Sequence, residues 1–216
     1  MKAGTVFVFA TAAEARPLLD TFDHTPLTDG GLRLHQIDDA LLLICGAGPA
    51  LAGAAIDALA RTWQPRRVVL GGVARRLHAR LPVGAIAQVG AACFDLPQRT
   101  TYVPVSNLRR ESWSGVHGDC TLLTRAAPVQ DGGESVALAR HADLIDREGA
   151  AVASACVQHG IECAIFKAVG EYAGAQPTTA GMTTELITRL AAFLLGHYRW
   201  LTQDPRTDGV RHAALT

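Results

Sequence analysis

Two acidic residues with the setting of an active site lie between residues 145 and 174. Glu148 stands at the start of an Ala-rich helical run, and Glu171 follows the apolar run 163–169. In an open α/β sheet, ligands bind in the crevice outside the carboxyl ends of the strands. We therefore expect both carboxyl groups to face one crevice, where carboxylates can bind hydroxyl groups and transfer protons.

Short apolar runs alternate with helical patterns along the chain, which is typical of parallel strands joined by crossover helices. The sequence predicts strands at residues 5–10, 32–37, 40–45, 67–70, 85–93, 121–123 and 163–169. It predicts helices at residues 12–21, 49–63, 147–159 and 183–201 and after Gly133. Residues 95–119 are the least regular part. We expect one domain over residues 1–203 and a flexible tail at 204–216.

Composition argues against several classes of partner. The 20 basic and 20 acidic residues give zero formal net charge, so there is no electrostatic case for nucleic acid or an anionic membrane as partner. No apolar run is long enough to span a membrane. The five cysteines include no C-x-x-C pair and predict reduced core thiols of a cytoplasmic protein. The eight histidines show no metal-ligand spacing, so we expect no metal and no cofactor.

Five segments follow one another along the chain: VFVFATAAEARPLL, LLLICGAGPALAGAA, VVLGGVARRLHARLPVGAIAQVG, TLLTRAAPV, and IDREGAAVA with FKAVGEYAG. Their order and spacing resemble the nucleoside phosphorylase superfamily, and within it the methylthioadenosine/S-adenosylhomocysteine nucleosidase branch. The resemblance implies a single-domain α/β fold, a three-layer αβα arrangement with a central mixed, partly barrel-like sheet. It also implies a small-molecule, nucleoside-like substrate, no cofactor and a homo-oligomer.

The resemblance assigns roles to the two acids. Members of the family cleave the bond between ribose and a base through a cationic sugar, and a Glu that follows a Met binds the ribose hydroxyls. The matching pair here is Arg147–Glu148. The family's proton donor to the departing base is an Asp in a pattern like R-A-I-S-D, and its position is taken by Glu171, whose extra methylene moves the acid by about 1.5 Å. The structural alternatives are a helix N-terminal acid for Glu148 and a solvated turn acid for Glu171.

The nucleophile separates hydrolysis from phosphorolysis. Phosphorolytic members bind phosphate with an Arg in the first loop, an Arg before the central Gly and a Ser or Thr after it. On alignment to Gly72 these positions are Glu14, Leu70 and Val73, so the phosphate ligands are missing. Hydrolytic members carry an acid in the first loop that positions or deprotonates water. Glu14 is the candidate here, and its structural alternative is an acid of a first helical turn.

Other positions depart from the family pattern. The central motif, close to G-S-A-G-G, reads GVARR from Gly72, and the aromatic residue that stacks on the base is replaced by Pro128. Arg75 and Arg76 are interpreted as solvated loop residues. The alternative interpretation is that one of them, or Arg147, recognises an anionic group that the usual substrates lack. The predicted catalytic residues are Glu14 and Glu171. The predicted substrate-binding residues are Glu148, Arg147, Gly72, Val73 and Pro128.

The leading hypothesis is hydrolysis of the N-ribosidic bond of a nucleoside or nucleoside-like metabolite. Two alternatives stay open. One is a catalytically weakened relative that binds a nucleoside-like ligand. The other is a phosphorylase whose anion site is relocated to Arg16, Arg75 or Arg76.

Overall fold

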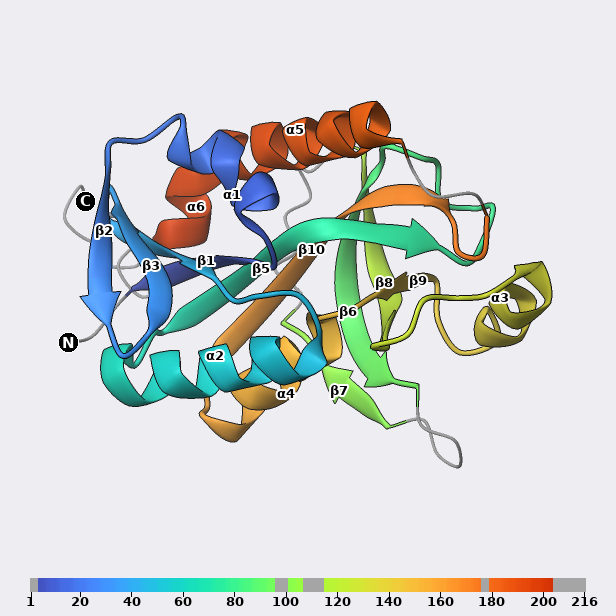
Figure 1. Ribbon diagram of the computed structural model, residues 1–216, viewed down its shortest axis with the longest axis horizontal. Coiled ribbons are helices and arrows are strands. Elements are labelled where there is room, and N and C mark those ends of the chain that lie inside the picture. The colour runs from blue at the N-terminus through green and yellow to red at the C-terminus, as the bar shows by residue number, and fades with distance from the viewer. Residues whose placement is uncertain (1–3, 96–100, 107–114, 176–178, 204–216) are drawn as a thin grey trace, which may run out of the picture.

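A computed structural model describes residues 4–95, 101–106, 115–175 and 179–203, and the expected tail at 204–216 lies outside this range. A sheet of ten strands lies between two groups of helices (Figure 1). One face is covered by α2 (Pro49–Trp63) and α4 (Gly149–Gln158), and the other by α1 (Ala12–Leu19), α5 (Ala180–Gly196) and α6 (Tyr198–Thr202). A short helix, α3 (Gly132–Leu138), lies at the far end of the sheet. The predicted three-layer αβα arrangement is confirmed.

The sheet divides into a closed part and an open part. The strands are β1 (Thr5–Phe9), β2 (His24–Asp29), β3 (Leu32–Ile37), β4 (Ala40–Ile44), β5 (Arg67–Arg76), β6 (Ile86–Phe94), β7 (Tyr102–Pro104), β8 (Val116–Thr124), β9 (Leu144–Asp146) and β10 (Glu162–Tyr172). Nine of them run in the order β10-β6-β8-β9-β5-β1-β4-β3-β2, and β7 pairs with β6 beside this path. A further pairing of β10 with β5 closes the first five of the order into a mixed barrel. The predicted barrel-like sheet is therefore confirmed.

Burial on both faces explains why the central strands are apolar along their length. All five residues of β1 and all five of β4 are buried, because helices cover both sides of these strands. On the α5 side, Phe7 stacks on Tyr198 with ring centroids 5.5 Å apart. The five cysteines are free and buried, as expected of core thiols.

Six strands differ from their predicted form. The sequence analysis missed β2, an edge strand that tolerates Pro26 because an edge needs fewer ladder hydrogen bonds, and it missed β7 and β9, which have only three residues each. β8 begins at Val116, earlier than the predicted residue 121. β5 and β10 are longer than predicted because they pair in parallel from Arg67 and Glu162 to Arg76 and Tyr172. The interpretation of Arg75 and Arg76 as loop residues is therefore wrong, since both lie in a strand of the barrel.

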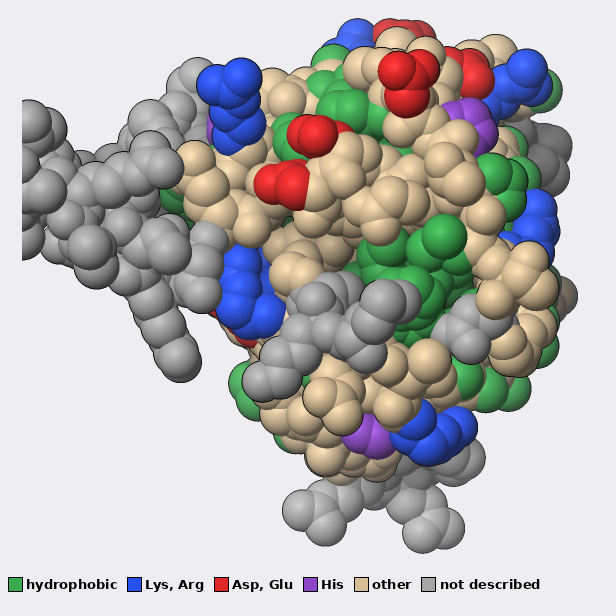
Figure 2. Space-filling view, turned by 90° about the vertical axis from the view of Figure 1, so that its left-hand side faces the viewer, with side chains coloured by type: hydrophobic (Ala, Val, Ile, Leu, Met, Phe, Trp, Pro, Cys, Tyr) green, Lys and Arg blue, Asp and Glu red, His purple; other side chains and the backbone are tan. Residues whose placement is uncertain are grey.

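The surface agrees with the balanced composition. On the face at the β2 end of the molecule, acidic and basic side chains are interspersed around an apolar patch, with no field of one sign (Figure 2). Among the residues placed in the structure, no helix combines the length and apolar character needed to cross a membrane.

Candidate active site

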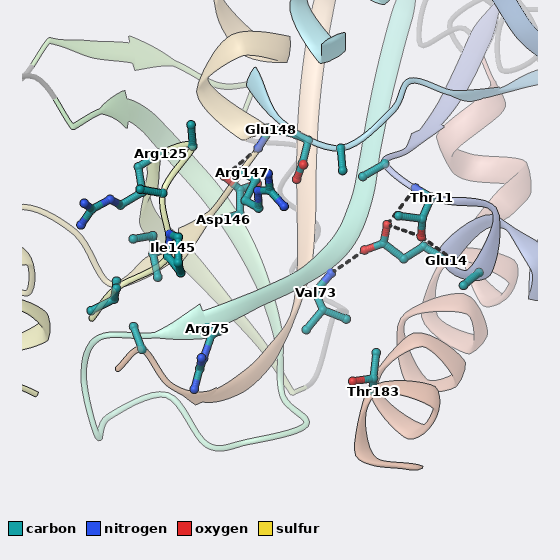
Figure 3. A pocket seen from close by; sticks show the side chains of 18 of the residues that line it. Thr11, Glu14, Val73, Arg75, Arg125, Ile145, Asp146, Arg147, Glu148 and Thr183 are labelled. Atoms are coloured by element: carbon teal, nitrogen blue, oxygen red, sulfur yellow. Dashed lines mark hydrogen bonds between the residues drawn. The ribbon is translucent and has the colours of Figure 1, made fainter. Parts of the chain in front are cut away.

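A cavity of about 560 Å³ opens where several strands end (Figure 3). Its walls come from the segments that follow β1, β4, β8, β9 and β10, from β5, and from the first turns of α5. This is the edge of the sheet at which an α/β fold is expected to bind its ligand. Most of the lining is small and apolar, and no aromatic side chain belongs to the lining in the part of the chain that the structure describes.

The turn from β9 into α4 places Glu148 in the cavity wall. Glu148 is the N-cap residue of α4, but its side chain does not cap that helix. Its Oε1 instead accepts a hydrogen bond of 2.7 Å from the backbone N–H of Gly48, at the start of α2. Glu148 as a whole residue is only 7% exposed. Its carboxylate lies at the start of α4 without capping that helix, and its role in binding stays a prediction.

Asp146 performs the capping that Glu148 does not. Its carboxylate accepts hydrogen bonds from the backbone N–H groups of Glu148 and Gly149 and from the hydroxyl of Thr124, 2.6 Å away. Thr124 in turn accepts a hydrogen bond from the N–H of Ala150. The start of α4 is thus fixed to β8, and with it the position of Glu148.

Lys167 is a residue of this site that the sequence analysis did not single out. It lies in the middle of β10 with its side chain 2% exposed, and its Nζ is 2.9 Å from Oδ2 of Asp146. The signal was present in the sequence, because a lysine inside the apolar run 163–169 must find an anionic partner. What the sequence does not show is that this partner is Asp146.

Glu14 reaches the cavity from the other side, across Val73 (Figure 3). Its Oε2 accepts hydrogen bonds from the N–H and hydroxyl of Thr11 in a capping box, and its Oε1 accepts one of 3.3 Å from the N–H of Val73. Glu14 therefore has both the helix-terminus role and a contact to β5. A Cβ added at Gly72 would lie 3.0 Å from Glu14 Oε1 and 3.1 Å from Lys167 Nζ. Gly72 does not line the cavity, but its missing side chain leaves room for both groups beside β5.

Neighbouring charges and burial shift the pKa values of this cluster. Burial raises the pKa of Glu148, and Lys167 and the Gly48 N–H offset only part of this rise. Burial also lowers the pKa of Lys167, but the charges of Asp146, Glu148 and Glu14 outweigh it, so that pKa lies above its usual value. Lys167 is therefore a charged ammonium. Burial, with a contribution from Glu148, raises the pKa of the nearby Cys45 thiol to about 12, which keeps it neutral.

The arginines near the cavity differ in how they are held. Arg147 is exposed and lines the cavity next to Glu148 (Figure 3). Arg75 also lines it, but Nη2 of Arg75 donates to the carbonyls of Tyr172 and Ala175. Arg76 does not line the cavity; it donates to the carbonyl of Leu81 and lies 4.3 Å from the Tyr172 ring centroid. Pro128 lines the cavity as an exposed residue, where it offers no aromatic stacking surface.

Glu171 is not brought into this cavity. The expectation that it faces the same crevice as Glu148 is not met, because β10 continues to Tyr172 and pairs there with Arg76 of β5. Glu171 sits at an irregularity in that pairing, half-buried and outside the cavity lining. The alternative of a solvated turn acid is also not met, since the residue belongs to a strand.

Metal ligands are not grouped in the described residues, where no cluster of three or more His, Cys, Asp or Glu side chains is positioned to hold an ion. The acids of the cavity are held by Lys167 and backbone N–H groups.

Comparison with known proteins gives similarity at the level of fold. No protein-family model matches the sequence, and no curated protein matches it. Among solved structures, a 5′-methylthioadenosine/S-adenosylhomocysteine nucleosidase from Helicobacter pylori is similar with a TM-score of 0.80 and 16% identity, over 92% of this chain and 99% of that one. The corresponding nucleosidase of Streptococcus pneumoniae gives 0.79 and 18%, over 90% and 97%.

Futalosine hydrolase of Helicobacter pylori is similar with a TM-score of 0.76 and 15% identity, over 89% of this chain and 95% of that one. At such low identities, the structural similarity establishes the fold alone. It agrees with the resemblance of the five sequence segments. The chain has the fold of these nucleosidases and of futalosine hydrolase.

Proposed function

We propose that this protein hydrolyses the N-ribosidic bond of a nucleoside or nucleoside-like metabolite. The observation that carries the proposal is the pair of carboxylates, Glu14 and Glu148, that line one cavity with the buried ammonium of Lys167 beside them. Cleavage of this bond develops positive charge on the sugar, which carboxylates held in a water-poor site stabilise. The similar solved structures are of hydrolytic nucleosidases, which supports the same class of reaction here.

Glu148 is proposed to bind the ribose hydroxyls. Only its Oε1 accepts a hydrogen bond from the described part of the chain, so Oε2 has its lone pairs available. An ionised carboxylate accepts hydrogen bonds from two adjacent hydroxyls. The contact with Gly48 fixes the carboxylate in the orientation for this binding before the substrate arrives.

Glu14 is proposed to position the attacking water. Among the described residues, its Oε1 accepts only the 3.3 Å hydrogen bond from Val73 N–H and so retains acceptor capacity. The Nζ of Lys167 also lies near Gly72, and Asp146 takes one of its three N–H donors. A water bound there would donate to Glu14, and its oxygen would be free to attack the sugar carbon.

The departing base is proposed to receive its proton from water. Glu14, Asp146 and Glu148 are the acids that line the cavity among the described residues, and the hydrogen bonds of Asp146 are already committed. Because Glu171 lies outside the lining, this proposal gives it no role in the transfer.

Phosphorolysis is less well supported. Of the three arginines considered for a relocated phosphate site, Arg16 is exposed and pairs with Asp20, and Arg76 is held outside the cavity. Arg75 lines the cavity with two hydrogen bonds to backbone carbonyls.

A second candidate function is binding of a nucleoside-like ligand without turnover. The position of Glu171 favours it, because the family's proton donor would then have no counterpart in the cavity. The cavity itself fits a ligand under either function.

The test is incubation of the purified protein with a panel of nucleosides, with and without inorganic phosphate. The proposed function predicts free ribose and free base at the same rate in both conditions. Formation of sugar 1-phosphate only in the presence of phosphate would show that the reaction is phosphorolysis and not hydrolysis. Saturable binding with no product would instead establish the second candidate.

A further inference from the structure

Three arginines line the cavity, and the partners of two of them are visible. Arg75 donates to two backbone carbonyls, and Arg125 lies 2.6 Å from a carboxylate oxygen of Glu134 and 3.4 Å from one of Asp95. Arg147 forms neither an ion pair nor a hydrogen bond with the part of the chain that the structure describes. It is the cation of the cavity that is available for a ligand.

The acids on either side of Arg147 in the sequence do not neutralise it. Asp146 is paired with Lys167, and Glu148 accepts from Gly48 N–H, so both carboxylates are turned to other partners. The guanidinium of Arg147 is exposed at the cavity wall and has no partner to give up among the described residues before it binds an anion. The planar guanidinium also binds phosphate or carboxylate through two parallel hydrogen bonds.

The position of Arg147 indicates which part of the substrate it would reach. A Cβ added at Gly48 would lie 3.8 Å from Nη2 of Arg147, and the N–H of the same Gly48 donates to Glu148. Arg147 and Glu148 therefore meet at one point of the wall, which Figure 3 shows as two adjacent side chains. If Glu148 binds the ribose hydroxyls, Arg147 lies at the ribose as well.

We infer that Arg147 binds an anionic group carried on the ribose of the substrate, so that the preferred substrates are nucleosides with a phosphate or carboxylate on the sugar. This inference rests on the proposed function, because it places the ribose at Glu148. Neutral nucleosides lie outside this class of substrates.

The experiment compares matched ligands that differ in this charge. Adenosine, adenosine 5′-monophosphate and adenosine 3′-monophosphate, with the corresponding inosine and uridine compounds, are titrated calorimetrically in phosphate-free buffer. Turnover of each is measured separately. At least one monophosphate is expected to bind about 10- to 100-fold more tightly than its nucleoside, the range of a charge-assisted hydrogen-bonding pair. This preference is expected to decrease at high salt.

Arg147→Gln is expected to weaken monophosphate binding more than nucleoside binding, so that the preference falls to about twofold or less, because the guanidinium is removed and Glu148 stays in place. Arg61→Gln is the matched control, since Arg61 is an exposed arginine in the last turn of α2 and does not line the cavity. It should bind all ligands as the wild type does.

Each outcome bears on the inference. Equal binding of nucleosides and monophosphates, or equal weakening of both by Arg147→Gln, would overturn it. So would a result in which inorganic phosphate alone competes as well as the monophosphates do, because the anion would then be free phosphate. Selective binding that depends on Arg147 without any release of base would support the inference and contradict the proposed hydrolysis, which keeps the two failures apart.

Discussion

The β9–α4 turn and the end of β10 are neighbouring segments that each carry an acid, and they hold it in different ways. In the turn, Glu148 is fixed by Gly48 N–H, and the turn itself is fixed by the hydrogen bonds of Asp146. At the end of β10, no hydrogen bond or ion pair to the Glu171 side chain is present among the described residues, and Glu171 lies outside the cavity.

The difference follows from where each strand stops. β9 has three residues and passes directly into a helix, so the acid after it lies at the strand's carboxyl end. β10 stays paired with β5 as far as Tyr172, and Glu171 falls at the irregularity in that pairing, outside the lining that Ala173 joins two residues later. The middle of β10 nevertheless belongs to the site, because Lys167 ties it to Asp146. An apolar strand followed by an acid is thus not enough to place that acid in a crevice.

The largest expected effect comes from breaking the link between the two segments. Lys167→Met leaves the carboxylate of Asp146 buried without its cation, and we expect a loss of about 3–5 kcal/mol in the free energy of unfolding. Urea denaturation followed by circular dichroism measures this. Lys167→Met combined with Asp146→Asn should recover part of the loss, because the uncompensated charge is removed. A single variant as stable as the wild type would show that the pair does not join the segments.

The next effect distinguishes the two acids directly. Glu148→Gln removes the charge that is proposed to bind the ribose, and we expect kcat/KM for the best nucleoside of the panel to fall about 100- to 1,000-fold, as losses of charged transition-state contacts do.

Glu171→Gln is the matched substitution at the other segment. We expect it to retain kcat/KM within about threefold, because Glu171 does not line the cavity. A loss at Glu171 as large as that at Glu148 would contradict the contrast drawn between the segments, and would restore Glu171 as the acid that serves the leaving base.

A smaller effect is expected at Gly72, which the side chains of Glu14 and Lys167 both approach. Gly72→Ala places a methyl group 3.0 Å from Glu14 Oε1 and 3.1 Å from Lys167 Nζ, so both flexible side chains must move. We expect a stability loss of about 1–2 kcal/mol and a roughly tenfold fall in kcat. Gly181→Ala in α5 is the control, since its added Cβ meets no atom within 4 Å. Equal activity of the two variants would show that the close packing at Gly72 does not matter for catalysis.

The smallest effect is a displacement of the acid limb of the pH profile. Burial raises the pKa of Glu148, so its proton is retained to higher pH than in an ordinary carboxyl of pKa about 4.3. A raised folded-state pKa favours folding at low pH, and this contribution is lost as the pH rises through that pKa. Activity has the opposite dependence, because the ionised form binds the hydroxyls. On acidification, we expect kcat/KM to begin to fall at a pH above the ordinary carboxyl range. We expect Glu171→Gln to show the same acid limb in its pH profile. A limb that disappears in Glu171→Gln would assign it to Glu171.

The sequence alone determined the order of most strands and helices, because hydrophobic periodicity and the glycines between elements are local signals; the edge strand β2 and the short strands β7 and β9 were missed. It also placed Glu14, Val73, Pro128, Arg147 and Glu148 in segments that meet at one cavity. These segments follow strands or form part of one, and parallel strands bring their carboxyl ends to one edge. The catalytic and binding roles of these residues stay predictions for the experiments above.

Only the tertiary structure decided the rest, because it depends on pairing between residues far apart in the chain. Closure of the barrel extended β5 and β10, which put Arg75 and Arg76 in a strand and Glu171 at an irregularity of the pairing, outside the cavity lining. The pairing of Lys167 with Asp146, and the absence of such a partner for Arg147 among the described residues, follow from the same arrangement. A burial pattern can require that a lysine be paired, but only the folded chain selects the carboxylate that pairs with it.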